Sequence, residues 1–249
     1  MGVRFSLQQF AAVFNVRNAD GLPYILIGGQ AVNYWAERYL LQEPDLQKLV
    51  PFTSEDIDFK GERADVKRIA EQLRLSAGYP HKVEMTALAG FIPFRIGDLQ
   101  SCIEVVRTIP GVSGSVETLA IEAEWAGKKI RVLDPVSLLA CKLALATSVS
   151  QAVRRDADHL RILGPCLRAF LREFLKGVEQ GQLPARGWLG AANRVLKLTS
   201  SARARKAAKE FGIDWSGVLP MDEITASNHE KLVGFRTRQL PRWRPCQPV

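Results

Sequence analysis

Two aspartates, separated by one residue, carry the chemistry that this sequence suggests most clearly. The segment Phe52–Phe59 reads F-T-S-E-D-I-D-F, and it ends in the alternating pattern of a half-buried strand. Because side chains two apart on a strand share a face, Asp56 and Asp58 present two carboxylates together while Ile57 and Phe59 point into a core. Two carboxylates about 6–7 Å apart suit Mg²⁺, which takes hard oxygen ligands and shares them with substrate phosphates. The pattern therefore predicts a magnesium site that handles phosphates.

A glycine pair lies upstream of this strand, at a predicted change from strand to helix. Residues 24–27 are an apolar run of strand length, and Gly28-Gly29 interrupts that run. Residues 30–41 then space their apolar side chains at the helical period. The predicted order is a strand, a glycine turn, a helix and then the acidic strand.

The combination of G-G with a following D-I-D resembles the signature of the DNA-polymerase-beta-like nucleotidyltransferase superfamily. More closely, it is similar to the AbiEii-type nucleotidyltransferases, many of which are bacterial toxins or anti-phage factors. The resemblance implies that Gly28 and Gly29 approach a nucleoside triphosphate while Asp56 and Asp58 hold two Mg²⁺ ions. Ser54 stands where the family often has a threonine, so its hydroxyl is expected to support the phosphates.

A third carboxylate lies within the apolar strand predicted at residues 102–109, which read C-I-E-V-V-R-T-I. Burying an unpaired carboxylate is costly, so Glu104 requires solvent, a partner such as Arg107, or a function. By itself Glu104 would be interpreted as an edge-strand residue, but the D-I-D strand favours a functional role. The resemblance implies that Glu104 replaces the family's usual aspartate as third metal ligand or general base, with its carboxylate one methylene further out.

Two more family positions fall in predicted helices. The helix predicted over residues 136–147 carries Lys142 within the apolar sequence L-L-A-C-K-L-A-L-A. Such a lysine can lay its stem along a core with its ammonium in water, whereas the resemblance implies that Lys142 contacts the nucleotide phosphates. In the sequence V-R-R-D-A-D-H-L-R-I-L, the resemblance implies that Asp156 helps to complete the catalytic site, with Asp158 as the alternative alignment.

The composition is that of a globular protein with a sizeable core. The chain has 249 residues, of which 47% are hydrophobic and 24% charged. No apolar run approaches the roughly 20 residues that cross a bilayer, and the N-terminus lacks a secretory pattern. We predict free thiols, because no zinc or redox spacing relates the four cysteines, Cys102, Cys141, Cys166 and Cys246. These observations predict a cytoplasmic protein without a membrane partner.

Hydrophobic periodicity predicts the remaining elements. Amphipathic helices are expected at residues 5–18, 64–75, 166–178, 183–198 and 202–211, and a β-hairpin at residues 121–133. Residues 40–51 look like an insertion relative to many family members, and residues 76–100 are expected to form loops and short strands. The predicted fold class is α/β (α+β): a nucleotidyltransferase core with a mixed sheet flanked by helices over residues 1–132, followed by a helical domain over residues 133–249 with a basic tail.

The basic charge is concentrated in the C-terminal part of the chain. The net charge is +8; residues 1–150 carry 16 basic and 17 acidic side chains, whereas residues 151–249 carry 18 and 9. Such a concentration attracts a polyanion without sequence readout, although a solvated basic surface is the alternative. The tail from Lys231 alternates Arg with Phe, Leu and Trp, which suits phosphate contacts and base stacking unless Leu240 and Trp243 pack on the body.

The predicted reaction is Mg²⁺-dependent transfer of a nucleoside monophosphate from an NTP to a hydroxyl acceptor. Asp56 and Asp58 would hold two Mg²⁺ ions, with Glu104 bridging them or acting as base. RNA, such as tRNA, is the preferred acceptor because it accounts for both the acidic site and the basic C-terminal part; a toxin or defence role would add an antitoxin as partner. The alternatives are a small-molecule nucleotidyltransferase of the antibiotic-modifying kind and a non-catalytic nucleic-acid- or partner-binding protein that kept the fold.

Overall fold

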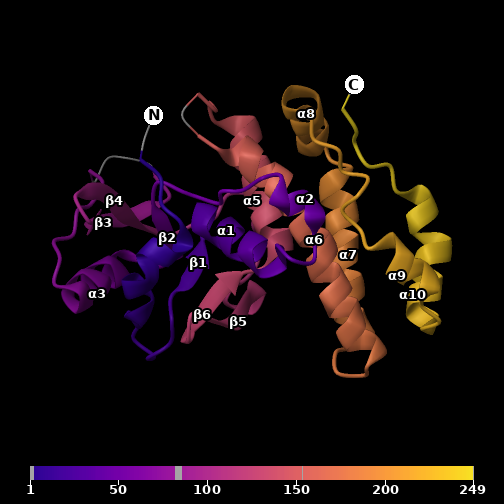
Figure 1. Cartoon of the computed structure of the whole chain (residues 1–249), viewed down its shortest axis with the longest axis horizontal. Coiled ribbons are helices and arrows are strands. Elements are labelled where there is room, and N and C mark those ends of the chain that lie inside the picture. Colours follow the sequence, from indigo (N-terminus) through magenta and orange to yellow (C-terminus); the bar gives the residue numbers. More distant parts are fainter. Residues whose placement is uncertain (1–2, 82–85, 153, 249) are drawn as a thin grey trace. The chain divides into compact units, whose positions relative to one another are not determined.

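The computed structural model describes residues 3–81, 86–152 and 154–248. It divides into two compact units, which are called the first and the second unit below. The first comprises Met1–Arg38 and Val50–Cys141, and the second comprises Tyr39–Leu49 and Lys142–Val249 (Figure 1). The domain boundary expected after residue 132 stays a prediction.

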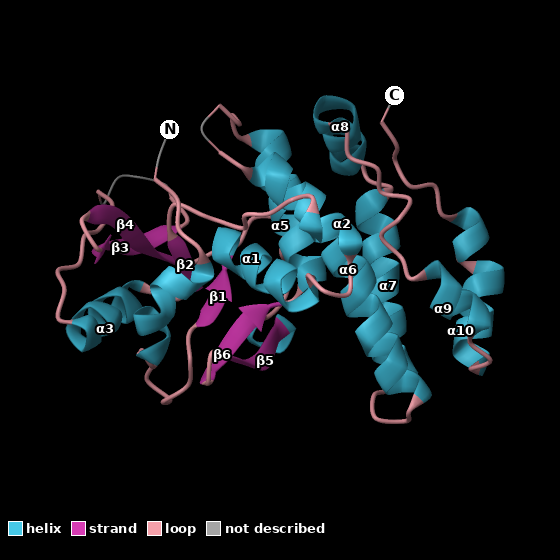
Figure 2. Cartoon of the chain, viewed as in Figure 1, coloured by secondary structure: helices cyan, strands magenta, loops and turns pink. Residues whose placement is uncertain are grey.

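The first unit contains a mixed sheet of six strands in the order β3-β4-β2-β1-β6-β5. The bounds are β1 (Ile25–Ile27), β2 (Ile57–Lys60), β3 (Leu88–Ile96), β4 (Leu99–Val106), β5 (Ala120–Trp125) and β6 (Lys128–Leu133). β1 pairs antiparallel with β2 and parallel with β6, β2 pairs parallel with β4, and the hairpins β3–β4 and β5–β6 form the two sides. Figure 2 shows these strands in magenta. The predicted fold class, a mixed sheet flanked by helices, is confirmed.

The middle of the sheet buries the apolar side of the acidic strand. Along β2, residues alternate between buried and half-buried, so Ile57 and Phe59 lie in the core while Asp58 faces the other side. All three residues of β1 are buried, as expected for a central strand covered on both faces. The strand that carries Asp58 is therefore fixed by the burial of one of its faces in the core and by its pairing with β1 and β4.

Helical segments cover this sheet: η1 (Leu7–Asn15), α1 (Gly28–Tyr39), α3 (Arg63–Leu73), α4 (Val116–Leu119) and α5 (Pro135–Ser148), which continues into the second unit. η1 packs on β6, and α3 packs on β3 and β4. η1 was predicted as an amphipathic α-helix, but it is a 3₁₀ helix. The reason lies in the spacing of Leu7, Phe10 and Val13, which are all buried, because a 3₁₀ helix has three residues per turn and aligns every third side chain.

The second unit is helical in its described residues. Its elements are α2 (Pro44–Gln47), α6 (Asp156–Glu179), α7 (Ala185–Thr199), α8 (Ala202–Phe211), α9 (Met221–Ala226), α10 (Glu230–Arg238) and η2 (Leu240–Arg242). α7 packs against α6, α8 and α10. Trp188 is fully buried, and Phe235 meets it edge to face with 5.3 Å between the ring centroids. This aromatic contact fixes α10, which belongs to the predicted basic tail, onto α7.

Two sequence predictions of local structure were wrong. Residues 76–100 include β3, a strand of nine residues, although Gly90 and Pro93 interrupt its pattern. β3 is the last strand of the sheet, where a proline without an N–H is tolerated, and a bulge lies between Leu88 and Gly90. The helix predicted at residues 166–178 is part of the longer helix α6, which begins at Asp156 and continues through Pro165. Val153 lies outside the described residues.

Other predictions agree with the structure. The β5–β6 hairpin forms as predicted, and α8 has its predicted bounds. All four cysteines are free, as expected from their spacing. Within residues 3–81, 86–152 and 154–248, no helix has both the length and the apolar character needed to cross a bilayer.

Candidate metal centre

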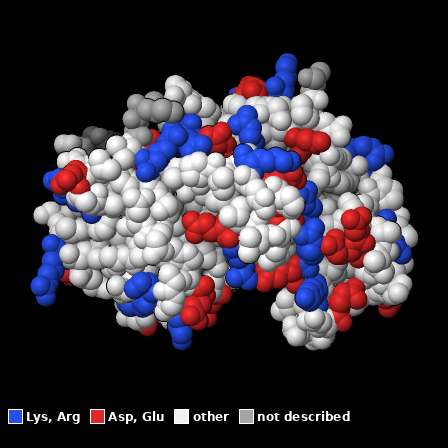
Figure 3. All heavy atoms as spheres, viewed as in Figure 1, with Lys and Arg blue, Asp and Glu red and all other residues white. Residues whose placement is uncertain are grey.

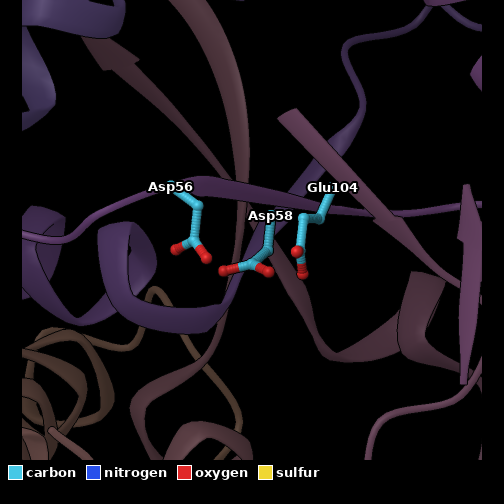
Figure 4. Close-up of side chains that lie close together, drawn as sticks. All are labelled: Asp56, Asp58 and Glu104. Atoms are coloured by element: carbon cyan, nitrogen blue, oxygen red, sulfur yellow. The ribbon is translucent and has the colours of Figure 1, made fainter. Parts of the chain in front are cut away.

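The pairing of β2 with β4 brings together the three carboxylates that were singled out in the sequence. The two strands are parallel, and their register places Asp58 directly opposite Glu104. Asp56 lies two residues before Asp58, in the bend that precedes β2, so the sequence prediction that it belongs to the strand is wrong. Ligand oxygens of Asp56, Asp58 and Glu104 all lie within 4.8 Å of one another. Figure 4 shows the three carboxylates side by side, projecting to the same side of the strands.

The chemistry of this cluster fits a hard divalent cation. The donors are all carboxylate oxygens, the ligand type that Mg²⁺ prefers, and each residue is half-buried, so substrate oxygens can reach the same ions. Burial and the nearby charges of Glu104, Asp56 and Asp58 raise the pKa of the Cys102 thiol to about 12. Like charges this close are mutually repulsive, and a bound cation would relieve that repulsion.

Gly28 closely borders one of the carboxylates. Ile27, the last residue of β1, lies opposite Asp58 in the antiparallel register, so the next residue runs alongside the Asp58 side chain. A Cβ atom at position 28 would lie 1.8 Å from Asp58 Oδ2, and Gly28 has a φ of +68° in the left-handed region. Glycine is therefore required here for space and for backbone conformation. Gly29 follows it as a buried residue of α1, and the approach of both glycines to a triphosphate stays a prediction.

Ser54 positions Asp56. Its hydroxyl donates a hydrogen bond to Asp56 Oδ1, with 3.2 Å between the oxygens. Its backbone exchanges two hydrogen bonds with Phe5, of 2.8 Å from Phe5 N and 3.0 Å from Ser54 N. The Asp56 carboxylate is thus oriented by a residue that an isolated β-bridge to the N-terminal segment holds in place. A contact between the Ser54 hydroxyl and phosphates stays a prediction.

Gln30 is a supporting residue that the sequence analysis missed. It is fully buried, its Nε2 donates to the Phe5 carbonyl oxygen at 3.0 Å, and its Oε1 accepts from Asn33 Nδ2 at 3.0 Å. Through Phe5 and Ser54 it connects the start of α1 to Asp56. The available signal was a pair of amide side chains, Gln30 and Asn33, one helical turn apart directly after the glycine pair.

Lys142 and Asp156 form a buried ion pair in the second unit. Lys142 Nζ lies 2.9 Å from Asp156 Oδ1, and Arg154 Nε lies 2.6 Å from Asp156 Oδ2. Lys142 is 4% exposed and Asp156 1%. Burial by itself raises the pKa of Asp156, but the charges and hydrogen bonds of Lys142 and Arg154 outweigh it and lower the pKa to about 2. The two predicted residues therefore meet each other, and their roles toward a nucleotide stay predictions.

The alternative residue, Asp158, has different neighbours. It pairs with Arg155 at 2.7 Å and with Arg161 at 2.9 Å, and its side chain is 39% exposed. The neighbouring His159 is buried, and burial together with the charge of Lys142 holds its pKa well below the ordinary value. Asp156 rather than Asp158 is thus the partner of Lys142.

Comparisons with known proteins find a structural likeness of low similarity. Neither the family models nor the curated protein sequences give a match to this chain. Among solved structures, the chain is similar to an antigenic nucleotidyltransferase-like protein from Paracoccidioides brasiliensis, with 11% sequence identity and a TM-score of 0.36. The similarity covers 65% of this chain and 71% of that chain. The acidic residues of this chain, rather than that likeness, carry the functional interpretation.

Proposed function

We propose that this protein is a Mg²⁺-dependent nucleotidyltransferase that transfers a nucleoside monophosphate from an NTP to a hydroxyl group. The observation that supports this function best is the cluster of Asp56, Asp58 and Glu104, whose ligand oxygens lie within 4.8 Å of one another. When bound, two Mg²⁺ ions would neutralise the triphosphate and favour deprotonation of the attacking hydroxyl.

Each carboxylate has a distinct part in this proposal. Asp56 and Asp58 hold the cations, with Ser54 orienting the first carboxylate and Gly28 leaving room for the second. Glu104 takes the proton of the acceptor hydroxyl, whose oxygen forms a bond to the α-phosphorus. The bond between the α-phosphorus and the oxygen that bridges to the β-phosphate breaks, and pyrophosphate leaves with that electron pair. Glu104 must be ionised to act as the base.

The acceptor in this proposal is RNA, such as tRNA. The support is the charge distribution, because residues 151–249 carry 18 basic and 9 acidic side chains and a phosphate polymer complements such an excess. The motif resemblance to AbiEii-type proteins is the basis for proposing a toxin or defence role in the cytoplasm, with an antitoxin as partner. In the same resemblance, Lys142 and Asp156 assist the nucleotide.

Calorimetry with each NTP, in the presence and absence of Mg²⁺, tests the catalytic part. The wild-type protein is expected to bind an NTP only with Mg²⁺, and Asp58→Asn should weaken that binding at least ~10-fold because the site loses one carboxylate oxygen and a negative charge. Asp98→Asn is the matched control, since Asp98 is exposed in the turn between β3 and β4. A folded wild-type protein that binds no NTP in a Mg²⁺-dependent way would contradict the proposal.

A further inference from the structure

Helix α8 carries a basic face on the second unit. Its ten residues read A-R-A-R-K-A-A-K-E-F, with four cations and one carboxylate. The side that faces the body of the unit consists of small residues, the buried Ala204, Ala207 and Ala208. Trp215 Nε1 donates to the Ala204 carbonyl oxygen at 3.1 Å, which holds that side in place. The opposite side is exposed and presents the four cations, Arg203, Arg205, Lys206 and Lys209.

Most of these cations lack an acidic partner, unlike the arginines of α6 and of the segment before it. Those arginines all form ion pairs with carboxylates: Arg154, Arg155, Arg161, Arg168 and Arg172. On α8, Lys206 lies 3.9 Å from Glu210, whereas Arg203, Arg205 and Lys209 have no ion pair with any described residue. Basic and acidic side chains are interspersed on the face drawn in Figure 3, so pairing rather than number decides which cations are available to a ligand.

The positions of these cations do not favour the helix itself. Arg203 lies in the first turn of α8, where the helix dipole favours a negative charge, and that turn contains no acidic residue. Arg205 and Lys209 are four residues apart on the same face, a spacing at which like charges repel. Lys209 is an exception, because it lies in the last turn, where the helix dipole favours a cation. Helix stability gives no reason for Arg203 and Arg205, whereas a bound polyanion would favour every one of these charges.

The C-terminal segment adds cations at the start of α8. Trp243 Nε1 donates to Thr199 Oγ1, and Cys246 N donates to the Thr199 carbonyl oxygen, each at 3.1 Å. These bonds anchor the segment two residues before Ser201, the N-cap of α8, and Figure 1 shows the segment passing beside that helix. The segment carries Arg242 and Arg244, which are exposed and form no ion pair with any carboxylate in the described ranges.

The aromatic residues of the tail are directed inward. Phe235 is 1% exposed and packs on Trp188, so the prediction that the tail stacks on bases is wrong for this residue. The Trp243 indole is tied to Thr199, which supports the alternative that Trp243 packs on the body. The exposed groups of this region are consequently guanidinium and ammonium groups, which suit phosphates rather than base edges.

We propose that α8 and the adjoining C-terminal segment form a docking surface for the phosphate backbone of RNA. This α8 basic surface consists of five exposed cations, Arg203, Arg205, Lys209, Arg242 and Arg244. The proposal rests on RNA as the acceptor in the proposed function and adds where and how the RNA is held. Contacts to phosphates carry no sequence information, so the surface accepts a structured RNA irrespective of its sequence.

Point variants of the full chain test this surface, because removing the tail would also delete the buried Phe235. Binding of a fluorescent RNA hairpin is measured by anisotropy over a range of KCl concentrations, without Mg²⁺ or NTP. The test variant combines three substitutions on α8, Arg203→Gln, Arg205→Gln and Lys209→Gln. The control removes the same charge from three exposed cations of other helices, Lys176→Gln, Arg186→Gln and Lys231→Gln. Arg186 and Thr199 lie at opposite ends of α7, whose 15 residues span about 22 Å.

The α8 variant should bind RNA at least ~10-fold more weakly at low salt. The magnitude of the slope of log affinity against log salt concentration should fall by about 2–3, because the variant neutralises fewer phosphates and so releases fewer counterions on binding. The control variant should bind as the wild type does. The α8 variant should also melt at the same or a higher temperature, a result that a merely structural role of these cations would not give.

Three results would overturn the docking surface. These are equal losses of affinity in the test and control variants, unchanged binding by the α8 variant, and binding of the wild type to phosphatidylserine vesicles but not to RNA. Because the assay contains neither Mg²⁺ nor NTP, each of them leaves the catalytic proposal intact. Loss of NTP binding with RNA binding preserved would contradict the catalytic proposal instead.

Discussion

Replacing Gly28 by alanine should disable the metal centre more than it destabilises the fold. A Cβ atom at this position would lie 1.8 Å from Asp58 Oδ2, and real Cβ atoms essentially never approach another atom closer than 3.0 Å, so the carboxylate must move by at least 1.2 Å. Metal–ligand distances tolerate deviations of about 0.2 Å. The displaced Asp58 oxygen can no longer share an ion with Asp56 and Glu104, and Mg²⁺-dependent NTP binding should be lost.

The cost to stability has two parts. Alanine in the left-handed conformation of Gly28 costs about 1–2 kcal/mol, and forcing the Asp58 side chain away from its rotamer adds roughly 0.5–1.5 kcal/mol. The expected total is about 2–3 kcal/mol. Gly127→Ala is the matched control, because Gly127 has a φ of +73° with nothing within 4 Å of its added Cβ. It should cost the same backbone term of about 1–2 kcal/mol and leave NTP binding unchanged.

Urea unfolding gives the two free energies of unfolding, and calorimetry gives NTP binding in the presence of Mg²⁺. Subtracting the control removes the backbone contribution and leaves the effect of the contact with Asp58. If Gly28→Ala is no less stable than Gly127→Ala and binds NTP as the wild type does, then Gly28 does not constrain Asp58 in the way that the structure indicates.

Three further substitutions address two individual carboxylates. Glu104→Gln keeps the size but removes the charge of the proposed base, so transfer should fall at least ~100-fold while NTP binding persists, and Glu104→Asp should retain or raise activity; transfer by Glu104→Gln at the wild-type rate would make Glu104 only a strand residue. The fold lowers the pKa of Asp156 from 3.8 to about 2. Its ionised carboxylate therefore stabilises the folded state above the unfolded pKa, by on the order of 2 kcal/mol, and this contribution is lost as pH falls from about 4 to about 2. Asp156→Asn should therefore lower the free energy of unfolding at pH 7 by about 3–5 kcal/mol, because Lys142 is left buried without its partner. The variant should also lose less stability than the wild type on acidification. If urea unfolding gives the same pH dependence for the variant and the wild type, the stabilising role assigned to Asp156 is wrong.

Local patterns in the sequence were sufficient to predict those helices and strands in which apolar side chains recur at the period of the backbone. The alternation in D-I-D predicted that Asp56 and Asp58 face the same way, because a strand reverses its side chains at every residue. β2 begins only at Ile57, but the two carboxylates do project to the same side. The sequence Asp134-Pro135 is typical of a helix start, and Asp134 Oδ1 accepts hydrogen bonds from Val136 N at 2.9 Å and Ser137 N at 3.0 Å at the start of α5. Features of this kind depend on neighbours within one turn or one strand, so their signal is contained in a few consecutive residues.

Features that depend on pairing and burial were decided only by the tertiary structure. Glu104 was a candidate by resemblance, and the parallel register of β2 with β4 is what places it opposite Asp58. The contact of Gly28 with Asp58, the link from Gln30 to Phe5, and the buried pair of Lys142 with Asp156 likewise join residues far apart along the chain or on different elements. No local period encodes such contacts, since they follow from which strands pair and which polar groups must find a partner when the core excludes water.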